Sequence, residues 1–305
     1  MLARVLLLLI CVWALPILAQ QRAASEFEID VSEPRFAIGS GPRVVIDEAH
    51  HNFHTLQGRF GPFAALLQAD GYRVSPWRSR FKREALAEVD VLVIANALPP
   101  ELSGDWSRPP VSAFSAGEIV ELGAWVREDG GSLLLIADHQ PFPATAADLA
   151  REFGFLFYNG YVLDRTRKKD RGFVTFTPGD GSLLEHPITS GDQGFLEVPS
   201  VTLFTGQALL APETARPLLR LGARHQLYLP GPDRRITPDT RSITVETWLQ
   251  GATLEAGRGR VAVFGEAGGF TAQKTRAGGT MGMNHPAGLY NDEFVLNTLR
   301  WLSPR

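Results

Sequence analysis

Four short apolar segments, each followed at once by polar residues, constrain the fold of this chain more than any other feature. Near-continuous runs of Val, Ile and Leu of this length are typical of parallel strands that are buried on both faces of a sheet. The segments therefore predict neighbouring strands of a parallel sheet. They read RVVIDEAH at 43–50, VDVLVIANALPP at 89–100, SLLLIADHQPFP at 132–143 and GRVAVFGEAGGF at 259–270.

Helical patterns alternate with these strands. Residues 61–72, GPFAALLQADGY, have apolar side chains at helical spacing and end near Gly71. A further strand, YRVSPW, follows at 72–77, and residues 291–302 form a terminal amphipathic pattern. Strands that alternate with helices indicate βαβ units. We therefore predict an α/β fold with a mostly parallel sheet and helices on both of its faces.

Two helix starts can be predicted from capping residues. Ser115 and Glu118 have the spacing of a capping box ahead of an apolar helical face. Thr145 and Asp148 are placed to cap a helix over 146–154.

The region from about 155 to 247 has a different composition. It is rich in β-branched and aromatic residues, and Pro and Gly interrupt it. Such a composition favours short strands. We expect a β-rich elaboration of the sheet, so that residues 20–305 form a single domain.

The N-terminus has the pattern of a signal peptide. One basic residue, Arg4, precedes an unbroken apolar run over 5–19. This run is shorter than the about 20 residues that span a bilayer, and it resembles a signal-peptide core with cleavage after Ala19. We therefore expect residues 1–19 to be removed and the protein to be exported. The alternative is a retained signal anchor, which is the only membrane contact that the sequence predicts.

Composition excludes several classes of site. The net charge of −3 gives no basic footprint for nucleic acid. The single cysteine, Cys11, lies inside the predicted signal peptide. The mature protein would thus have no disulfide, thiolate metal ligand or cysteine nucleophile.

Polar and titratable residues follow the predicted strands. In an open parallel sheet, ligands bind outside the carboxyl ends of the strands, so residues from distant parts of the chain should meet at one edge. We predict Asp138, His139 and Glu266 as catalytic candidates. The predicted ligand-binding residues at the same edge are Glu48, His50, His51, His54, Asn96, Asn284 and His285.

These residues leave the type of site open. His50, His54, Asp138 and His139 could supply the nitrogen and oxygen ligands of a zinc ion, but their spacing matches no recognised metal motif. We therefore assign no metal ligand and leave the cofactor unknown. Asp47, at the end of the first predicted strand, is interpreted as a buried hydrogen-bond anchor.

The order of elements resembles the class I glutamine amidotransferase-like fold over about 43–150 and 258–302. RVVIDEAH resembles its first strand, VDVLVIANAL the strand before the oxyanion loop, GSLLLIADHQ the strand entering the nucleophile elbow, and RVAVFGEAG the strand that ends in the triad His and Glu. HPITSG, TFTPG, FGEAGGFTAQ, GMNHP and NDEFVLNTLRWL resemble a group of exported bacterial proteins of unknown function with such a domain. The resemblance implies a flavodoxin-like sheet.

One departure from this family decides what the resemblance implies for activity. Where the family has its elbow cysteine, this chain has Asp138 or His139. Neither side chain can form the thioester that amide transfer needs, so glutaminase activity is not expected.

Three functional hypotheses remain. The first is binding of a polar ligand, either a small molecule or an envelope component, at the carboxyl edge of the sheet. The second is a hydrolase that uses a metal or a carboxylate–histidine pair there. The third is a non-catalytic interaction module in envelope assembly. An edge lined by aromatic residues favours the first, a metal site the second, and a large exposed apolar patch the third.

Overall fold

The computed structural model describes residues 21–192, 194–275 and 278–304. The predicted signal peptide at 1–19, with Cys11, lies outside the described residues. Within them, no helix is long and apolar enough to cross a membrane.

The core of the molecule is a mixed sheet whose central strands are parallel. The order β3-β2-β4-β5-β15 runs parallel throughout, and β14, β10 and β6 continue the sheet with antiparallel pairing. Strand β11 also pairs with β14. The strands are β2 (Arg43–Asp47), β3 (Arg73–Trp77), β4 (Val91–Ala95), β5 (Ser132–Ile136), β6 (Leu156–Phe157), β10 (Leu209–Leu210), β11 (Arg216–Arg220), β14 (Leu249–Ala256) and β15 (Gly259–Phe264).

The predicted α/β class is confirmed, but the whole sheet is mixed where a mostly parallel one was expected. The antiparallel part begins at the tight connection between β14 and β15, where Gly257 has a φ of 61°. A connection this short joins only antiparallel strands, because parallel strands need a long crossover.

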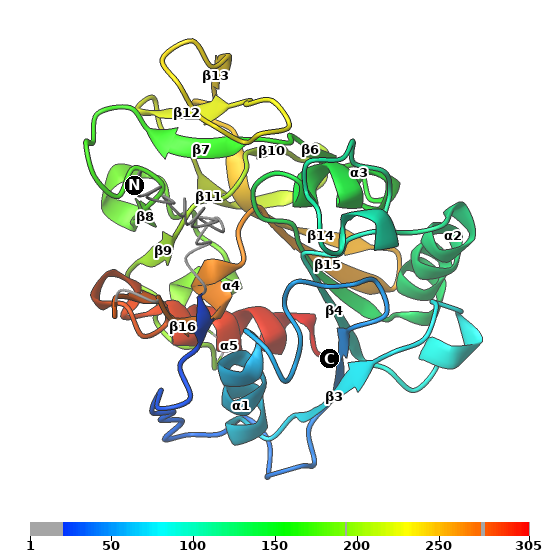
Figure 1. Cartoon of the computed structure of the whole chain (residues 1–305). Coiled ribbons are helices and arrows are strands. Elements are labelled where there is room, and N and C mark those ends of the chain that lie inside the picture. The colour runs from blue at the N-terminus through cyan, green and yellow to red at the C-terminus, as the bar shows by residue number, and fades with distance from the viewer. Residues whose placement is uncertain (1–20, 193, 276–277, 305) are drawn as a thin grey trace, which may run out of the picture.

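Helices cover both faces of this sheet (Figure 1). On one face, α1 (Gly61–Ala69) and α5 (Asn291–Leu302) pack over Val44 and Ile46 of β2. On the other, α2 (Ala116–Ala124) and α3 (Phe142–Glu152) pack in the cluster that contains Val45. Neighbouring residues of β2 thus enter opposite clusters, as the two-residue period of a strand requires.

Capping explains how two of these helices begin. The predicted capping box is confirmed, since Ser115 Oγ accepts the Glu118 N–H and the Glu118 carboxylate accepts the Ser115 N–H. Helix α3 begins at Phe142, earlier than the predicted cap at Thr145. Thr145 is instead buried inside the helix, where its hydroxyl donates to the Ala97 carbonyl at 2.7 Å.

The segment between α3 and β14 contains short strands and one short helix. Its strands form two further small sheets, ordered β13-β12-β7 and β8-β9, while β1-β16-β17 form a third near the N-terminal end. The elements are β7 (Tyr161–Asp164), β8 (Val174–Phe176), α4 (Pro187–Ser190), β9 (Val201–Leu203), β12 (His225–Tyr228), β13 (Ser242–Thr244), β1 (Arg22–Ala23), β16 (Ala272–Lys274) and β17 (Thr280–Gly282).

Single helical turns join several of these elements. They are η1 (Glu84–Leu86), η2 (Pro100–Leu102), the π-turn η3 (Trp125–Asp129), η4 (Pro178–Asp180), η5 (Gly268–Phe270) and η6 (Pro286–Gly288).

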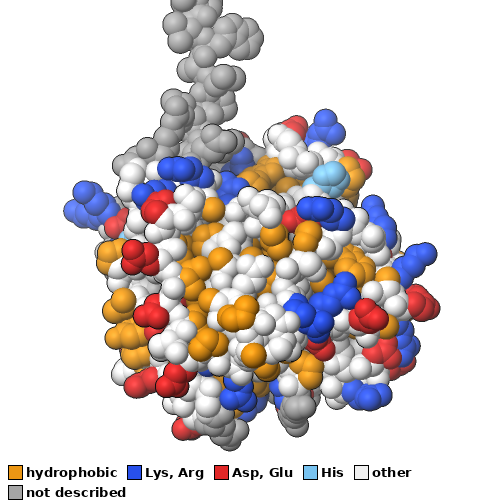
Figure 2. All heavy atoms as spheres, turned by 90° about the horizontal axis from the view of Figure 1, so that it is seen from below, with side chains coloured by type: hydrophobic (Ala, Val, Ile, Leu, Met, Phe, Trp, Pro, Cys, Tyr) orange, Lys and Arg blue, Asp and Glu red, His pale blue; other side chains and the backbone are white. Residues whose placement is uncertain are grey.

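Exposed large hydrophobic side chains come from separate segments of the chain. On the face shown in Figure 2, hydrophobic side chains are divided from one another by neutral and charged atoms. Among the described residues, the exposed large hydrophobic side chains are Ile38, Val111, Val120, Leu156 and Leu289.

Candidate functional site

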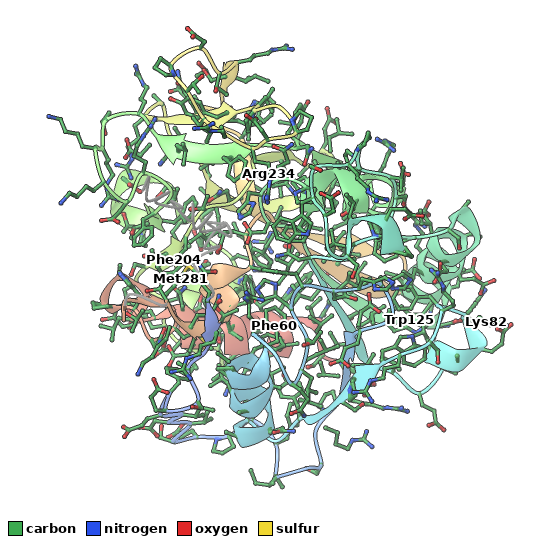
Figure 3. All side chains as sticks on the ribbon, in the orientation of Figure 1. Phe60, Lys82, Trp125, Phe204, Arg234 and Met281 are labelled. Carbon is green, nitrogen blue, oxygen red and sulfur yellow. The ribbon has the colours of Figure 1, made fainter. Side chains whose placement is uncertain are left out.

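A cavity of about 160 Å³ opens where the carboxyl ends of β5 and β15 meet the loop after β2. We call it the acid-pair cavity. Phe204 and Met281 of its wall lie next to each other in Figure 3. Its lining residues are Gln21, Phe53, His54, Asp138, His139, Phe142, Phe204, Thr205, Glu266, Gly268, Gln273 and Met281.

Two buried carboxyl groups, Asp138 and Glu266, are the central feature of this cavity. Burial raises the pKa of Asp138 to about 7. Burial and the neighbouring Asp138 charge raise the pKa of Glu266 well above its ordinary value. Two carboxylates that share a buried site cannot both ionise freely. We therefore expect the pair to retain a proton at neutral pH and to offer both a hydrogen-bond donor and acceptors.

The turn after β15 fixes the position of Glu266. Its two carboxyl oxygens accept the Gly268 and Gly269 N–H groups at 2.6 and 2.8 Å. A Cβ atom at Gly268 would lie 2.5 Å from Glu266 Oε1. Glycine at this position thus allows the carboxyl group to approach the backbone.

Asn96 links Asp138 to His54. The Asp138 N–H can only donate, and it donates to Asn96 Oδ1 at 2.8 Å. Asn96 Nδ2 must then be the donor to His54 Nδ1 at 3.1 Å. In the neutral imidazole this leaves the hydrogen on His54 Nε2.

His139 has the opposite arrangement of donor and acceptor. Its Nδ1 lies 2.9 Å from the Gln140 carbonyl oxygen, which can only accept. Nδ1 therefore carries the hydrogen and Nε2 is an acceptor. The ring stacks on Tyr161 with centroids 4.7 Å apart.

Burial keeps both histidines neutral near pH 7. It lowers the pKa of His139 to about 4, and Arg234 contributes to the decrease. It lowers the pKa of His54 to about 3, with smaller effects of Arg59 and His139. The cavity thus contains one imidazole donor and one imidazole acceptor.

Gln273 adds another acceptor to the wall. Thr271 Oγ1 donates to the Gly268 carbonyl at 2.7 Å, so it must accept from Gln273 Nε2 at 2.8 Å. This fixes the orientation of the amide. Gln273 Oε1 is buried and has no hydrogen-bond partner within the described residues. Nearby, Thr205 has a φ of 128°, which is a strained value for a β-branched residue.

A larger hollow of about 310 Å³ lies at the opposite edge of the sheet, near Ser132 and Gly259. It is formed where β5 and β15 begin. Ligands of open α/β sheets bind at the carboxyl ends of the strands, so this hollow is the weaker candidate.

No family model and no curated protein matches this chain. Among solved structures, the mmIFT52 N-terminal domain has a TM-score of 0.60 at 14% identity, over 86% of this chain and 98% of that chain. The likeness is one of fold.

Two further structures show weaker similarity. A ThuA-like protein from Bacteroides uniformis ATCC 8492 is 12% identical over 90% of this chain and 94% of that chain, with a TM-score of 0.46. The cytoplasmic protein STM1381 from Salmonella typhimurium LT2 is 16% identical over 86% of this chain and 99% of that chain, with a TM-score of 0.49. Of these three structures, the mmIFT52 domain is the one whose fold is compared with that of this chain.

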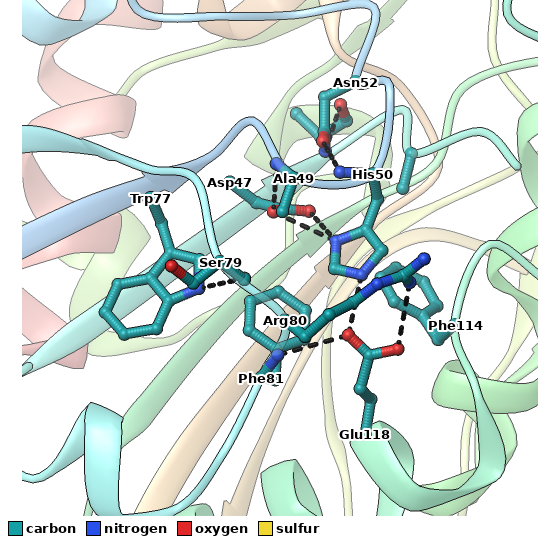
Figure 4. Close-up of polar contacts among 12 residues, drawn as sticks. Asp47, Ala49, His50, Asn52, Trp77, Ser79, Arg80, Phe81, Phe114 and Glu118 are labelled. Atoms are coloured by element: carbon teal, nitrogen blue, oxygen red, sulfur yellow. Dashed lines mark hydrogen bonds and ion pairs between the residues drawn. The ribbon is translucent and has the colours of Figure 1, made fainter. Parts of the chain in front are cut away.

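His50 is buried beside β2 (Figure 4), and it is not one of the residues that line the acid-pair cavity. Its Nδ1 contacts Asp47 Oδ2 at 2.9 Å and its Nε2 contacts Glu118 Oε1 at 3.0 Å. Two carboxylate partners need two N–H donors, and only the imidazolium has both. Burial acts to lower the pKa of His50, but Asp47 and Glu118 outweigh it and raise the pKa.

The other predicted ligand-binding residues contact the protein itself. Glu48 accepts the Leu56 N–H and pairs with Arg78. Asn284 exchanges two hydrogen bonds with the backbone of Gln273.

Two of the predicted histidines also lie away from the cavity lining. His51 is exposed, with a φ of 43°. His285 caps η6 by accepting the Ala287 N–H.

The acid-pair cavity thus brings together four predicted residues, His54, Asp138, His139 and Glu266, with Asn96 directly behind them. In the described parts of the chain, no group of three or more His, Cys, Asp or Glu side chains is placed to hold a metal ion.

The apolar and amide residues of the cavity wall were not predicted from the sequence. Phe53 directly precedes His54, and Phe142 follows His139 by three residues, so their closeness to predicted site residues in the sequence could have indicated them. Phe204, Thr205 and Gln273 come from the β-rich region and from β16, where nothing in the sequence indicates which side chains reach the carboxyl edge.

Proposed function

We propose that this protein binds a polar, hydroxyl-bearing small molecule in the acid-pair cavity. The observation that carries the proposal is that Asp138 and Glu266, two buried carboxyl groups whose pKa values burial raises, both line one cavity. A hydroxyl group both donates and accepts hydrogen bonds. It therefore matches a wall that combines the His54 N–H, the His139 acceptor nitrogen and the free Gln273 oxygen.

The size of the cavity limits what can enter. Pockets for drug-sized ligands measure about 300–1,000 Å³, and this cavity measures about 160 Å³. The ligand is therefore small, or only one end of it enters. The Phe53, Phe142 and Phe204 rings supply the apolar part that such sites need.

We also propose that the chain has an amidotransferase-like domain with a flavodoxin-like sheet. The strand order β3-β2-β4-β5-β15 supports it, because it is the 2-1-3-4-5 order of flavodoxin-like sheets. Asp138 and His139 follow β5, where that family has its cysteine, so glutaminase chemistry is not part of the proposal.

The proposed location is outside the cytoplasm. The apolar run over 5–19 supports export, with residues 1–19 removed. A polar small molecule or an envelope component would then be the partner.

Hydrolysis is a second candidate function that one observation favours. A general acid or base works best when its pKa lies near the working pH, and the pKa of Asp138 is raised to about 7. In that case Asp138 would exchange the proton, while Glu266, whose pKa burial and the Asp138 charge raise, would stay protonated. The interaction-module hypothesis has no comparable observation in its favour among the described residues.

A binding screen tests the proposal. Monosaccharides, polyols and the corresponding sugar acids are titrated calorimetrically into the purified protein and into Asp138→Ala. We expect at least one compound to bind the wild type and to lose at least tenfold in affinity for the variant. Glu213→Gln, at an exposed position, should bind like the wild type.

Product analysis of the same mixtures separates binding from hydrolysis. Turnover that is lost in Asp138→Asn would favour the hydrolase. If no compound binds, or if Asp138→Ala binds as well as the wild type, the proposal is wrong.

A further inference from the structure

Two arginines stack on aromatic rings beside the acid-pair cavity, and neither has a carboxylate partner among the described residues. The Arg59 guanidinium lies 3.9 Å from the centroid of the Phe53 ring, and that of Arg234 lies 4.8 Å from the Trp106 centroid. Phe53 and Trp106 pack edge to face with centroids 5.1 Å apart. Because Phe53 lines the cavity, both cations lie against a two-ring wall that reaches into it.

Arg59 has unused hydrogen-bonding capacity. Its Nε is buried and has no hydrogen-bond partner within the described part of the chain. Burial without an opposite charge lowers the pKa of Arg59 from its ordinary value. Stacking on a ring holds the guanidinium plane but leaves its N–H edge available. An oxyanion supplies the acceptors that this edge lacks.

Arg234 occupies the corresponding position at the other histidine of the cavity. It lies below the β7-β12-β13 sheet, toward the middle of the molecule (Figure 3). Its charge contributes to lowering the pKa of His139, as the charge of Arg59 does for His54. Each imidazole of the cavity thus has a cation beside it.

The acid pair does not exclude an anionic ligand. Two ionised carboxylates would repel it, but the pair retains a proton at neutral pH. Arg59 and Arg234 supply positive charge beside the cavity. The raised pKa values of Asp138 and Glu266 reduce the negative charge inside it.

We propose that the ligand of the acid-pair cavity carries an oxyanion, a carboxylate or a phosphate, which binds to Arg59 while the hydroxyl-bearing end enters the cavity. Arg234 provides the second cation at the same wall. This inference rests on the proposed function, because it names the chemical class of that ligand.

Inorganic phosphate and acetate are the first probes, titrated into the purified full chain. We expect one of them to bind saturably and to lose at least tenfold in affinity in Arg59→Gln. Arg59→Lys keeps the charge but not the fork of N–H groups, so it should retain part of the affinity. Arg235→Gln, next to Arg234 but exposed, is the matched control and should bind like the wild type.

The two probes distinguish a carboxylate ligand from a phosphate ligand. The inference is overturned if neither probe binds, or if Arg59→Gln binds both as well as the wild type does. Glucose, glucuronate and glucose 6-phosphate separate this result from the proposed function. If phosphate or acetate binds through Arg59 but no sugar responds to Asp138→Ala, the proposed function fails and the anion site stands. If a sugar binds through Asp138 but affinity is independent of Arg59 and of ligand charge, only the inference fails.

Discussion

At the scale of single residues, Asn96 organises the site. It has a φ of 54° at the end of β4, a conformation that Asn tolerates better than most residues. From there its amide orders two functional groups at once, accepting from the Asp138 N–H and donating to His54. The sequence placed Asn96 at this edge, but it could not show that its role is to fix a tautomer.

Replacing Asp138 by Asn should stabilise the protein at alkaline pH. Burial raises the pKa of Asp138 from 3.8 to about 7, so the folded state keeps a proton that the unfolded chain loses in this window. The wild-type free energy of unfolding should therefore fall as pH rises from about 4 to 7. Since one pKa unit corresponds to about 1.4 kcal/mol, we expect Asp138→Asn to be more stable by a few kcal/mol at pH 8.

Urea unfolding at pH 4 and pH 8 measures this difference. The difference in the free energy of unfolding between Asp138→Asn and the wild type should nearly vanish at pH 4. Asp239→Asn, at an exposed position, should be as stable as the wild type at both pH values. Destabilisation of Asp138→Asn at pH 8 would instead identify a structural anchor.

At the scale of elements, a buried charge network joins β2 to α2. His50 lies between Asp47 at the end of β2 and Glu118 in the first turn of α2, and Arg80 also pairs with Glu118. Phe81 and Phe114 pack on the His50 ring. The clustering of histidines after the first strand indicated a site, but one of the two partners of His50, Glu118, is distant in sequence and could not be predicted from spacing.

Replacement of His50 by Gln should destabilise the protein strongly at acidic pH. The folded-state pKa of His50 is raised above 6.5, so its contribution is complete below pH 6.5 and is lost as pH rises through the folded-state pKa. Breaking a buried pair leaves uncompensated charge and costs about 3–5 kcal/mol. Urea unfolding should show this loss at pH 6 and a smaller loss at pH 9. An equal loss at both values would contradict an imidazolium at His50.

The start of α2 gives a smaller prediction. Ser115→Ala removes the side-chain acceptor of the Glu118 N–H and a bond to the Glu118 carboxylate. Loss of such a cap costs about 1 kcal/mol. Thermal unfolding should show this decrease, whereas Ser25→Ala, at an exposed position outside any helix, should leave stability unchanged. A loss as large as that of His50→Gln would mean that the cap also orders the charge network.

At the scale of the whole molecule, the apolar runs predicted the parallel strands because both of their faces are buried. The antiparallel extension was harder to predict. Strand β14 lies in a segment that reads LQGATLEA and is almost wholly buried, so it lacks the alternation that identifies a half-exposed strand. The cavity wall was also hard to predict, because Phe204 and Gln273 are brought to the carboxyl edge by the tertiary fold and not by any local sequence pattern.

Export is a prediction for the whole chain. N-terminal sequencing of protein recovered from outside the cytoplasm should begin near Gln20, because the apolar run over 5–19 has the length of a signal-peptide core. An intact Met1 on cytoplasmic protein would contradict it.

The central claim is that Asp138 and Glu266 form a carboxyl pair that holds a proton at neutral pH. Carbon-13 NMR of the two side-chain carboxyl carbons, followed from pH 3 to pH 10, measures this directly. We expect no full ionisation of the pair below about pH 7, because both groups are buried and repel each other. Asp138→Asn should lower the apparent pKa of Glu266 by removing the neighbouring charge. Two carboxylates that are both fully ionised by pH 5 would contradict the account.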